Sequence, residues 1–315
     1  MTPAPVLALL LALAAVAIAT VAGWVLAALA GSLLQRVDIV SAPVRASLLA
    51  QIRLLPMMLP LVVVPAQIAG FVRFEGTAPE SAGPLLIGAA CLGLFLLVDA
   101  LWSGMKAAHH TRAILSQWRA TAAPFRVPTW PRNAWLIRRR FPVVAVVGIV
   151  RPELFVDRRV ADSCTAEELA AIAAHEAAHV AARDNLRRLL FSLTPGARLA
   201  SSIGAPLEDQ WTAAAELAAD TDARRNSDPL DLASALIKVG RLTSRATPEA
   251  MPASAFIGSH DLESRVRRLL DPPVRSTRIT AGWLPAGVLV TVAILLQTSP
   301  ALSGLHELFE MLVRK

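Results

Sequence analysis

Residues 175–179 read HEAAH and lie in the Ala-rich segment 166–182, which consists almost entirely of strong helix formers. On a helix, side chains four positions apart share a face, so His175 and His179 can both point at one Zn²⁺. Glu176 projects about 100° away around the helix axis, toward a metal-bound water that it could deprotonate. The stretch therefore predicts a zinc-binding helix that carries its own general base.

A third ligand is predicted in residues 216–220, which read ELAAD and lie in another helical segment, about 206–226. Catalytic zinc takes three protein ligands and leaves one position open for water. Glu216 is the best candidate for the third ligand. Asp220, one turn further along the same face, is placed to accept a hydrogen bond from a ligating imidazole. The alternative, solvated helices with incidental histidines and carboxylates, explains these offsets poorly, so we expect one Zn²⁺ per chain.

Three further stretches resemble one family of membrane peptidases. Residues 148–156 (GIVRPELFV) resemble its G-x-x-R-P strand, and residues 165–186 resemble its catalytic helix with the R-D-N-L that follows. Residues 262–270 (LESRVRRLL) resemble its closing helix. With the two zinc motifs, the chain resembles the BlaR/MecR-type antirepressor zinc metallopeptidases of the gluzincin clan over about residues 132–273. CAAX-protease and heat-shock membrane peptidases share the zinc motifs, but the R-P strand and R-D-N-L favour the BlaR/MecR branch.

The resemblance implies a role for each site residue. It implies three zinc ligands: His175, His179 and Glu216. It also implies Glu176 as the general base. Many gluzincins stabilise the oxyanion with a Tyr or His side chain, yet this chain contains no Tyr. His260, before the last of the helical segments, and Arg224, on the helical segment that carries Glu216, are the candidates for that role.

Composition indicates a membrane protein, with 55% hydrophobic residues and a mean hydropathy of +0.52. Four apolar segments are long enough to span a bilayer: about 6–34, 54–72, 81–102 and 279–299. We expect a mainly α membrane protein with a membrane domain at 1–105, an α+β gluzincin-type zinc peptidase domain with a small β-sheet at 106–278, a fourth transmembrane helix at 279–299 and a short tail at 300–315. The alternative for the N-terminal segment is a signal peptide cleaved near residues 28–30, but a basic n-region is missing and the apolar run is too long.

Basic residues near the ends of the spans predict the orientation. The first loop contains Arg36, Arg45 and Arg53, and residues 106–159 contain 11 basic against 2 acidic residues. Both regions should therefore be cytoplasmic, in a bacterial inner membrane, with the N-terminus and the tail outside. The net charge of +7 is best explained by attraction to the anionic inner leaflet. Direct nucleic-acid binding is not expected.

Short strands are predicted at residues 134–137, 143–150 and 154–157, which are rich in β-branched and apolar residues. The remaining helices are predicted at four places: 166–193, 206–226, 229–242 and 261–270. Thr165 and Glu168 form a T-x-x-E capping box before the first of these helices. A small sheet edge beside the zinc helix indicates that a substrate chain binds extended, as an added strand.

These observations favour an integral-membrane zinc endopeptidase that cleaves a protein substrate, such as a transcriptional repressor, at the cytoplasmic membrane face. Two alternatives stay open: a catalytically silent membrane transducer that retains the zinc fold, and a membrane-protein quality-control protease. The tail at 300–315 is too short for the penicillin-binding sensor domain of the antibiotic-sensing relatives. We therefore expect that the chain does not itself sense β-lactams, and that a regulatory membrane partner, the bilayer or substrate presentation sets its activity.

Overall fold

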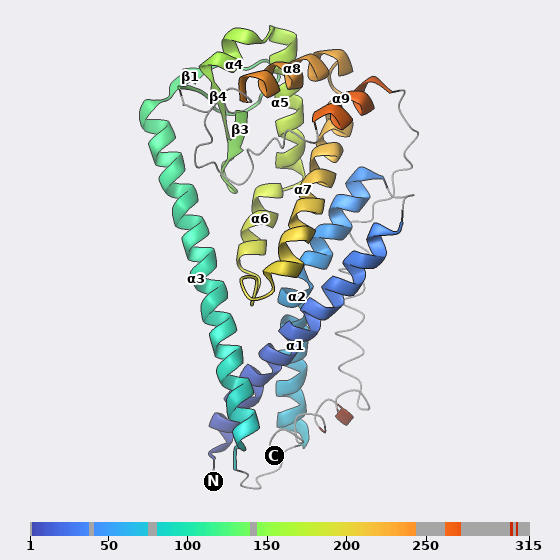
Figure 1. Cartoon of the computed structure of the whole chain (residues 1–315). Helices are drawn as coiled ribbons and strands as arrows, with labels where there is room; N and C mark the ends of the chain where they lie inside the picture. Colours follow the sequence, from blue (N-terminus) through green and yellow to red (C-terminus); the bar gives the residue numbers. More distant parts are fainter. Residues whose placement is uncertain are drawn as a thin grey trace.

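The computed structural model describes residues 2–37, 41–74, 81–138, 144–243 and 262–271, together with residues 303, 304 and 307. Figure 1 shows long helices that carry a smaller body of strands and short helices at one end. The predicted fourth span at 279–299, the tail at 300–315 and His260 lie outside the described residues.

Among the described residues, three helices are long and apolar enough to cross a membrane: α1 (Ala4–Gln35), α2 (Ala42–Phe74) and α3 (Pro84–Thr121). Helices α1 and α2 contain the predicted spans 6–34 and 54–72, and α3 begins three residues after the start of the span predicted at 81–102. Two of the helices extend well beyond the apolar segments. Helix α2 begins 12 residues before residue 54, and α3 continues for 19 residues after residue 102. Pro56, Pro60 and Pro65 all lie inside α2, where neighbouring helices make such breaks in the backbone ladder tolerable.

Small residues allow the three long helices to approach closely. A methyl group on Gly93 of α3 would overlap the backbone carbonyl of Leu13 on α1. A methyl group on Gly23 of α1 would lie 2.5 Å from the Cα of Pro56 on α2. Such contacts bring backbones together in the way that is typical of helix packing in membranes. The three helices therefore form one tightly packed unit.

Four short strands form a mixed sheet: β1 (Ala123–Phe125), β2 (Ala134–Ile137), β3 (Val144–Val147) and β4 (Glu153–Asp157). The order is β1-β2-β4-β3, with β2 and β4 parallel and the other two pairs antiparallel. The predicted strand at 143–150 ends at Val147, because Gly148, at φ 109°, begins the turn into β4. The short strand β1 was not predicted. Its three residues carry too little pattern to be read from the sequence.

The end of α3 covers one face of the sheet, where Trp118 packs edge-on against Phe155 with ring centroids 5.2 Å apart. The other face packs against helices α5 (Ala166–Ala181) and α8 (Pro229–Thr243), and Leu154, Ile172 and Val239 belong to the same buried cluster. The sheet therefore lies between a continuation of the third long helix and the zinc helix α5. This position explains why α3 continues past its apolar segment.

The helix predicted at 166–193 is in fact two helices, α5 and α6 (Asp184–Ser192). Arg183 adopts a left-handed conformation, with φ 57°, which ends one helix and begins the other. An interruption of this kind is uncommon at a residue other than Gly and is not visible in a run of helix formers. The other helices are α4 (Arg158–Ser163), α7 (Ser201–Ala223) and α9 (Leu262–Leu270).

The hairpin formed by α6 and α7 is inserted between α3 on one side and α1 and α2 on the other (Figure 1). Trp24 of α1 donates a hydrogen bond to the carbonyl of Pro195 over 2.9 Å, and Arg198 forms an ion pair with Asp99 of α3. Further along, Leu49 of α2 shares a buried cluster with Trp211 of α7. Residues on either side of the expected division at 105/106 therefore share one core.

Candidate metal centre

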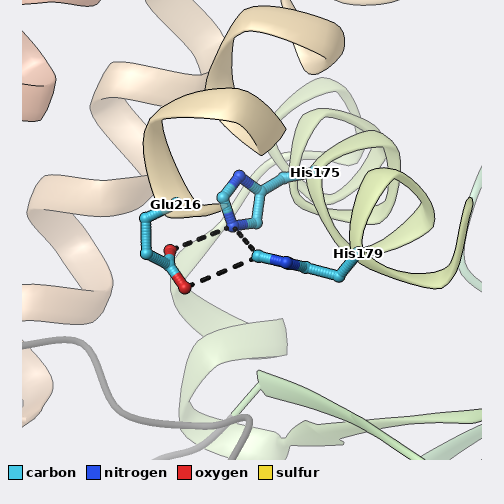
Figure 2. Close-up of side chains that lie close together, drawn as sticks. All are labelled: His175, His179 and Glu216. Carbon is cyan, nitrogen blue, oxygen red and sulfur yellow. Dashed lines mark hydrogen bonds and ion pairs between the residues drawn. The ribbon is translucent and has the colours of Figure 1, made fainter. Parts of the chain in front are cut away.

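The convergence of three side chains defines the candidate metal centre (Figure 2). His175 and His179 come from α5 and Glu216 from α7. The two histidine Nε2 atoms are 3.1 Å apart. Glu216 Oε2 lies 3.4 Å from Nε2 of His175, and its Oε1 lies 3.5 Å from Nε2 of His179. One nitrogen of each imidazole and the carboxylate thus face a common point.

This arrangement fits a zinc ion. With metal–ligand distances of about 2.0–2.1 Å, a tetrahedral ion requires its ligand atoms to be roughly 3.3 Å apart. The three measured separations, from 3.1 to 3.5 Å, lie around that value. Two imidazoles and one carboxylate are also a typical ligand set for catalytic zinc. The residues predicted to share one ion are therefore brought together by the fold.

Helix α5 is fixed in place at its first turn. The Thr165 hydroxyl accepts a hydrogen bond from the backbone N–H of Glu168, whose carboxylate accepts one from the N–H of Thr165 over 2.8 Å, so the predicted capping box is confirmed. Ser234 and Lys238 of α8 both donate hydrogen bonds of 2.6 Å to the same carboxylate. The buried Glu168 thus joins the start of the zinc helix to α8.

Each histidine has its own carboxylate partner behind the centre. Asp220 Oδ1 lies 2.9 Å from Nδ1 of His175, in the position predicted for it. Asp184 Oδ2 lies 2.8 Å from Nδ1 of His179, and this pairing was not predicted. Partners of this kind hold a ligating ring in one orientation and present its other nitrogen to the metal. The signal for Asp184 was available in the R-D-N-L stretch, although its role was not assigned.

Arg265 on α9 is a further site residue that the sequence did not reveal. It is only 2% exposed. Its Nε donates a hydrogen bond to Oδ2 of Asp220 and its Nη2 donates one to Oδ1, both over 2.8 Å. Its Nη1 lies 2.9 Å from Oε2 of Glu216. One guanidinium thus balances the charge of both Asp220 and Glu216, and the closing helix is part of the site.

The buried charges shift the pKa values of this cluster in opposite directions. Burial favours the neutral form of His175, but contacts with Asp220 and Glu216 outweigh it and raise the pKa to about 10. Burial is likewise outweighed for Glu216, where contacts with His175 and the nearby charges lower the pKa to about 2. The metal-free centre therefore holds a proton on His175, which a metal ion must displace when it binds.

Glu176 lies beside a cavity of about 400 Å³ that His179 also lines. The backbone N–H of Val146 on β3 donates a hydrogen bond to the Glu176 carboxylate. Burial raises the pKa of Glu176 above its usual range, and the neighbouring histidines reduce this effect. A carboxylate with a raised pKa accepts a proton more readily, so the environment suits a general base.

The free edge of β3 is already hydrogen-bonded at two residues. Asn185 Nδ2 lies 3.0 Å from the carbonyl oxygens of Val146 and Gly148 and donates to both. The N–H of Val146 is bonded to Glu176. A substrate strand added at this point would have to displace Asn185, so the expected strand addition does not find free backbone groups at Val146.

Arg224, one of the two oxyanion candidates, is not among the residues that converge at the centre. Arg224 donates hydrogen bonds of 2.9 Å to the carbonyls of Arg268 and Asp271, at the end of α9. Its guanidinium is therefore used to hold that helix end, and we do not propose it for the oxyanion role. His260 lies outside the described residues.

Comparison with known families agrees with the geometry. Residues 145–216 match Peptidase family M48, and this stretch runs from β3 to the third candidate ligand, Glu216. The match supports a zinc-dependent metallopeptidase of that family, while the finer assignment to the BlaR/MecR branch remains a hypothesis. A search of curated proteins found no match.

Proposed function

We propose that this protein is an integral-membrane zinc endopeptidase. The observation that carries the proposal is the convergence of His175, His179 and Glu216 at separations suited to one zinc ion. The match to Peptidase family M48 and the three helices long enough to span a bilayer support a membrane metallopeptidase. The reaction is hydrolysis of a peptide bond in a protein substrate.

The three ligands would hold a zinc ion that polarises the scissile carbonyl and lowers the pKa of the attacking water. Glu176 accepts the proton of that water and passes it to the leaving amine. Asp220 and Asp184 keep the two imidazoles in the orientation that presents Nε2. Arg265 offsets the negative charge gathered on α7.

Room on both sides of the centre favours internal cleavage of a chain. The 400 Å³ cavity lies along the face of α5 that carries Glu176 and Val180. A second cavity, of about 330 Å³, lies along the face that carries Ala178 and Ala182 and reaches the start of α2. His179 lines both cavities. A polypeptide can therefore continue in both directions from the scissile bond.

We further propose that the centre faces the cytoplasm and that the substrate is a cytoplasmic regulatory protein, such as a repressor. The positive-inside rule supports the orientation. The structure adds that α1 ends and α2 begins toward the end of the molecule that carries the centre (Figure 1). The repressor assignment rests on the resemblance to BlaR/MecR-type peptidases alone.

Elemental analysis and proteolysis of the purified protein test the proposed reaction. We expect one zinc per chain and cleavage of an unfolded test protein. Glu176→Gln should keep the zinc and lose the cleavage, whereas the matched change Glu167→Gln, at an exposed position on the same helix, should keep both. Undiminished zinc in a His175→Ala, His179→Ala double variant would contradict the ligand assignment.

Single introduced cysteines test the orientation after Cys91 and Cys164 are replaced by Ala. Ser41→Cys lies before α2 and Ser81→Cys lies before α3, at opposite ends of the long helices. We expect an impermeant thiol reagent to label the first only from the cytoplasmic side and the second only from outside. The reverse pattern would place the catalytic centre outside the cell and exclude a cytoplasmic substrate.

A further inference from the structure

Arg188 stands out among the residues that line the cavity beside the metal centre. It lies on α6 and borders the same 400 Å³ cavity as Glu176 and His179. Its Nε is buried and has no hydrogen-bond partner. Its guanidinium carbon lies 5.0 Å from the centroid of the Trp211 ring.

Arg188 is partly buried, whereas Arg53 and Arg265 are fully buried and both have carboxylate partners. Arg53 bonds to Glu208 over 2.6 Å, and Arg265 bonds to Asp220. Leaving a partly buried guanidinium without a hydrogen-bonded counter-ion is costly, because its buried Nε loses water and gains no acceptor. Burial accordingly lowers the pKa of Arg188, and the more distant charges of Glu216 and Asp184 oppose this effect only partly. Among the described residues, no carboxylate is hydrogen-bonded to the Nε of Arg188, and a ligand can supply one.

The nearby carboxylates already have other roles. Asp184 contacts His179 and also Arg187, with the latter ion pair at 3.0 Å. Glu216 contacts both histidines and Arg265. A zinc ion at the centre would draw on the charge of Glu216 still further and leave Arg188 less compensated. The group that completes Arg188 must therefore enter the cavity from outside.

The walls of the cavity favour an anion carried on an otherwise apolar segment. Two more arginines, Arg132 and Arg183, lie exposed at its border. Val180, Leu186 and Pro152 supply apolar surface between them. A guanidinium binds a carboxylate through two parallel hydrogen bonds, which gives both affinity and orientation. The ligand chemistry that fits is a carboxylate on a peptide.

We propose that Arg188 binds a carboxylate of the substrate in this cavity, and that the peptidase therefore selects acidic sequences next to the scissile bond. The carboxylate is either an Asp or Glu side chain or a free C-terminus, and both present the same chemistry to the guanidinium. This inference rests on the proposed function, because it assigns the cavity to the substrate. Arg188 is a specificity-determining residue for that reaction.

Peptide capture tests the inference without requiring hydrolysis. Full-length Glu176→Gln protein in detergent is immobilised and exposed to short peptides of randomised sequence, in one pool with free and in another with amidated C-termini. Retained peptides are then sequenced. We expect Asp or Glu to be enriched over Asn or Gln by about 10-fold or more at one position in both pools, or the free C-termini to be retained preferentially by a similar factor. The first result identifies a side chain and the second a C-terminus.

Substitution of Arg188 provides the decisive comparison. Arg188→Gln should abolish the preference, while Arg158→Gln, which removes an equal charge at a half-exposed position on α4, should leave it unchanged. Should Arg188→Gln fail to fold, Arg188→Lys serves instead and should reduce the preference without reversing it. Equal retention of acidic and neutral peptides by the Arg188-containing protein would overturn the inference.

Kinetics separate this role from direct action on the reacting carbonyl. If Arg188 selects a carboxylate, Arg188→Gln raises KM for acidic peptides and leaves neutral peptides unaffected. A uniform fall in kcat with unchanged KM for every peptide would overturn the inference, because it would place the guanidinium at the oxyanion. Peptide capture without any cleavage by the wild-type protein would refute the proposed peptidase activity and leave the carboxylate site intact.

Discussion

Replacing Arg265 tests whether its positive charge is needed to balance the buried carboxylates of Asp220 and Glu216 at the metal centre. Its guanidinium is buried and reaches two carboxylates on α7 with separations of 2.8 to 2.9 Å. In Arg265→Met the apolar stem is kept and the positive charge is lost. Asp220 and Glu216 are then left as buried negative charges with less compensation.

The expected cost depends on the metal. Removing one partner of a buried ion pair typically costs about 3–5 kcal/mol, so metal-free Arg265→Met should lose a free energy of unfolding of that order. A bound zinc ion supplies positive charge to the same two carboxylates, so the loss should be smaller when zinc is present. By linkage, a smaller loss in the zinc-bound state means that the variant binds zinc more tightly than the wild type.

Denaturant titration in detergent, followed by tryptophan fluorescence with and without zinc, measures both quantities. Arg267→Met is the matched control, because Arg267 is 73% exposed on the same helix and its ion pair with Glu263 is worth no more than about 0.5 kcal/mol. Two results would refute the reasoning: a metal-free loss as small as that of the control, or a larger loss with zinc than without it.

Three further predictions follow from single contacts. Asp184→Asn should weaken zinc binding by about 10–100-fold in a chelator competition, whereas Asp222→Asn, in an exposed ion pair, should not change it. Gly93→Ala should lower the free energy of unfolding in detergent by about 1–3 kcal/mol, because the added methyl group overlaps the backbone of Leu13. Gly88→Ala, on the same helix, places its methyl group where nothing lies within 4 Å, so it should leave the stability unchanged or increase it. Burial of Glu168 is outweighed by its hydrogen bonds, which lower its pKa. The ionised Glu168 therefore stabilises the fold fully above its unfolded pKa of about 4.3, and this stabilisation is lost as the pH falls through the folded pKa. The loss in free energy of unfolding caused by Glu168→Gln should accordingly become smaller in acid. A loss that stays constant across pH would contradict this assignment.

The local features of this protein could be derived from its sequence. The period of 3.6 residues places His175 and His179 on one face wherever a helix forms. The capping box of Thr165 fixes the start of that helix within a single turn. Apolar length alone located the three long helices. Each of these features depends on residues within a few positions of one another, and a local pattern therefore suffices.

The interruption at Arg183 is an exception among local features. The run of helix formers predicted one continuous helix to about residue 193, and the left-handed residue divides it instead. Helix propensity carries no signal for this conformation, which directly precedes two residues with tertiary contacts, Asp184 with His179 and Asn185 with β3. The break sets the start of α6, and hence the position of Asp184 against His179.

The completed metal centre depends on elements that are distant in the chain. Glu216 reaches the two histidines because α7 packs beside α5, and Arg265 reaches Glu216 because α9 closes over α7. The α6–α7 hairpin is held between long helices by Trp24 and Asp99. The pattern of apolar and charged residues predicts which face of a helix is buried, but many other helices or strands could cover that face equally well. Only the simultaneous packing of all the elements selects the partner. That packing places Arg265 at the metal centre and leaves the Nε of Arg188 without a hydrogen-bonded carboxylate among the described residues.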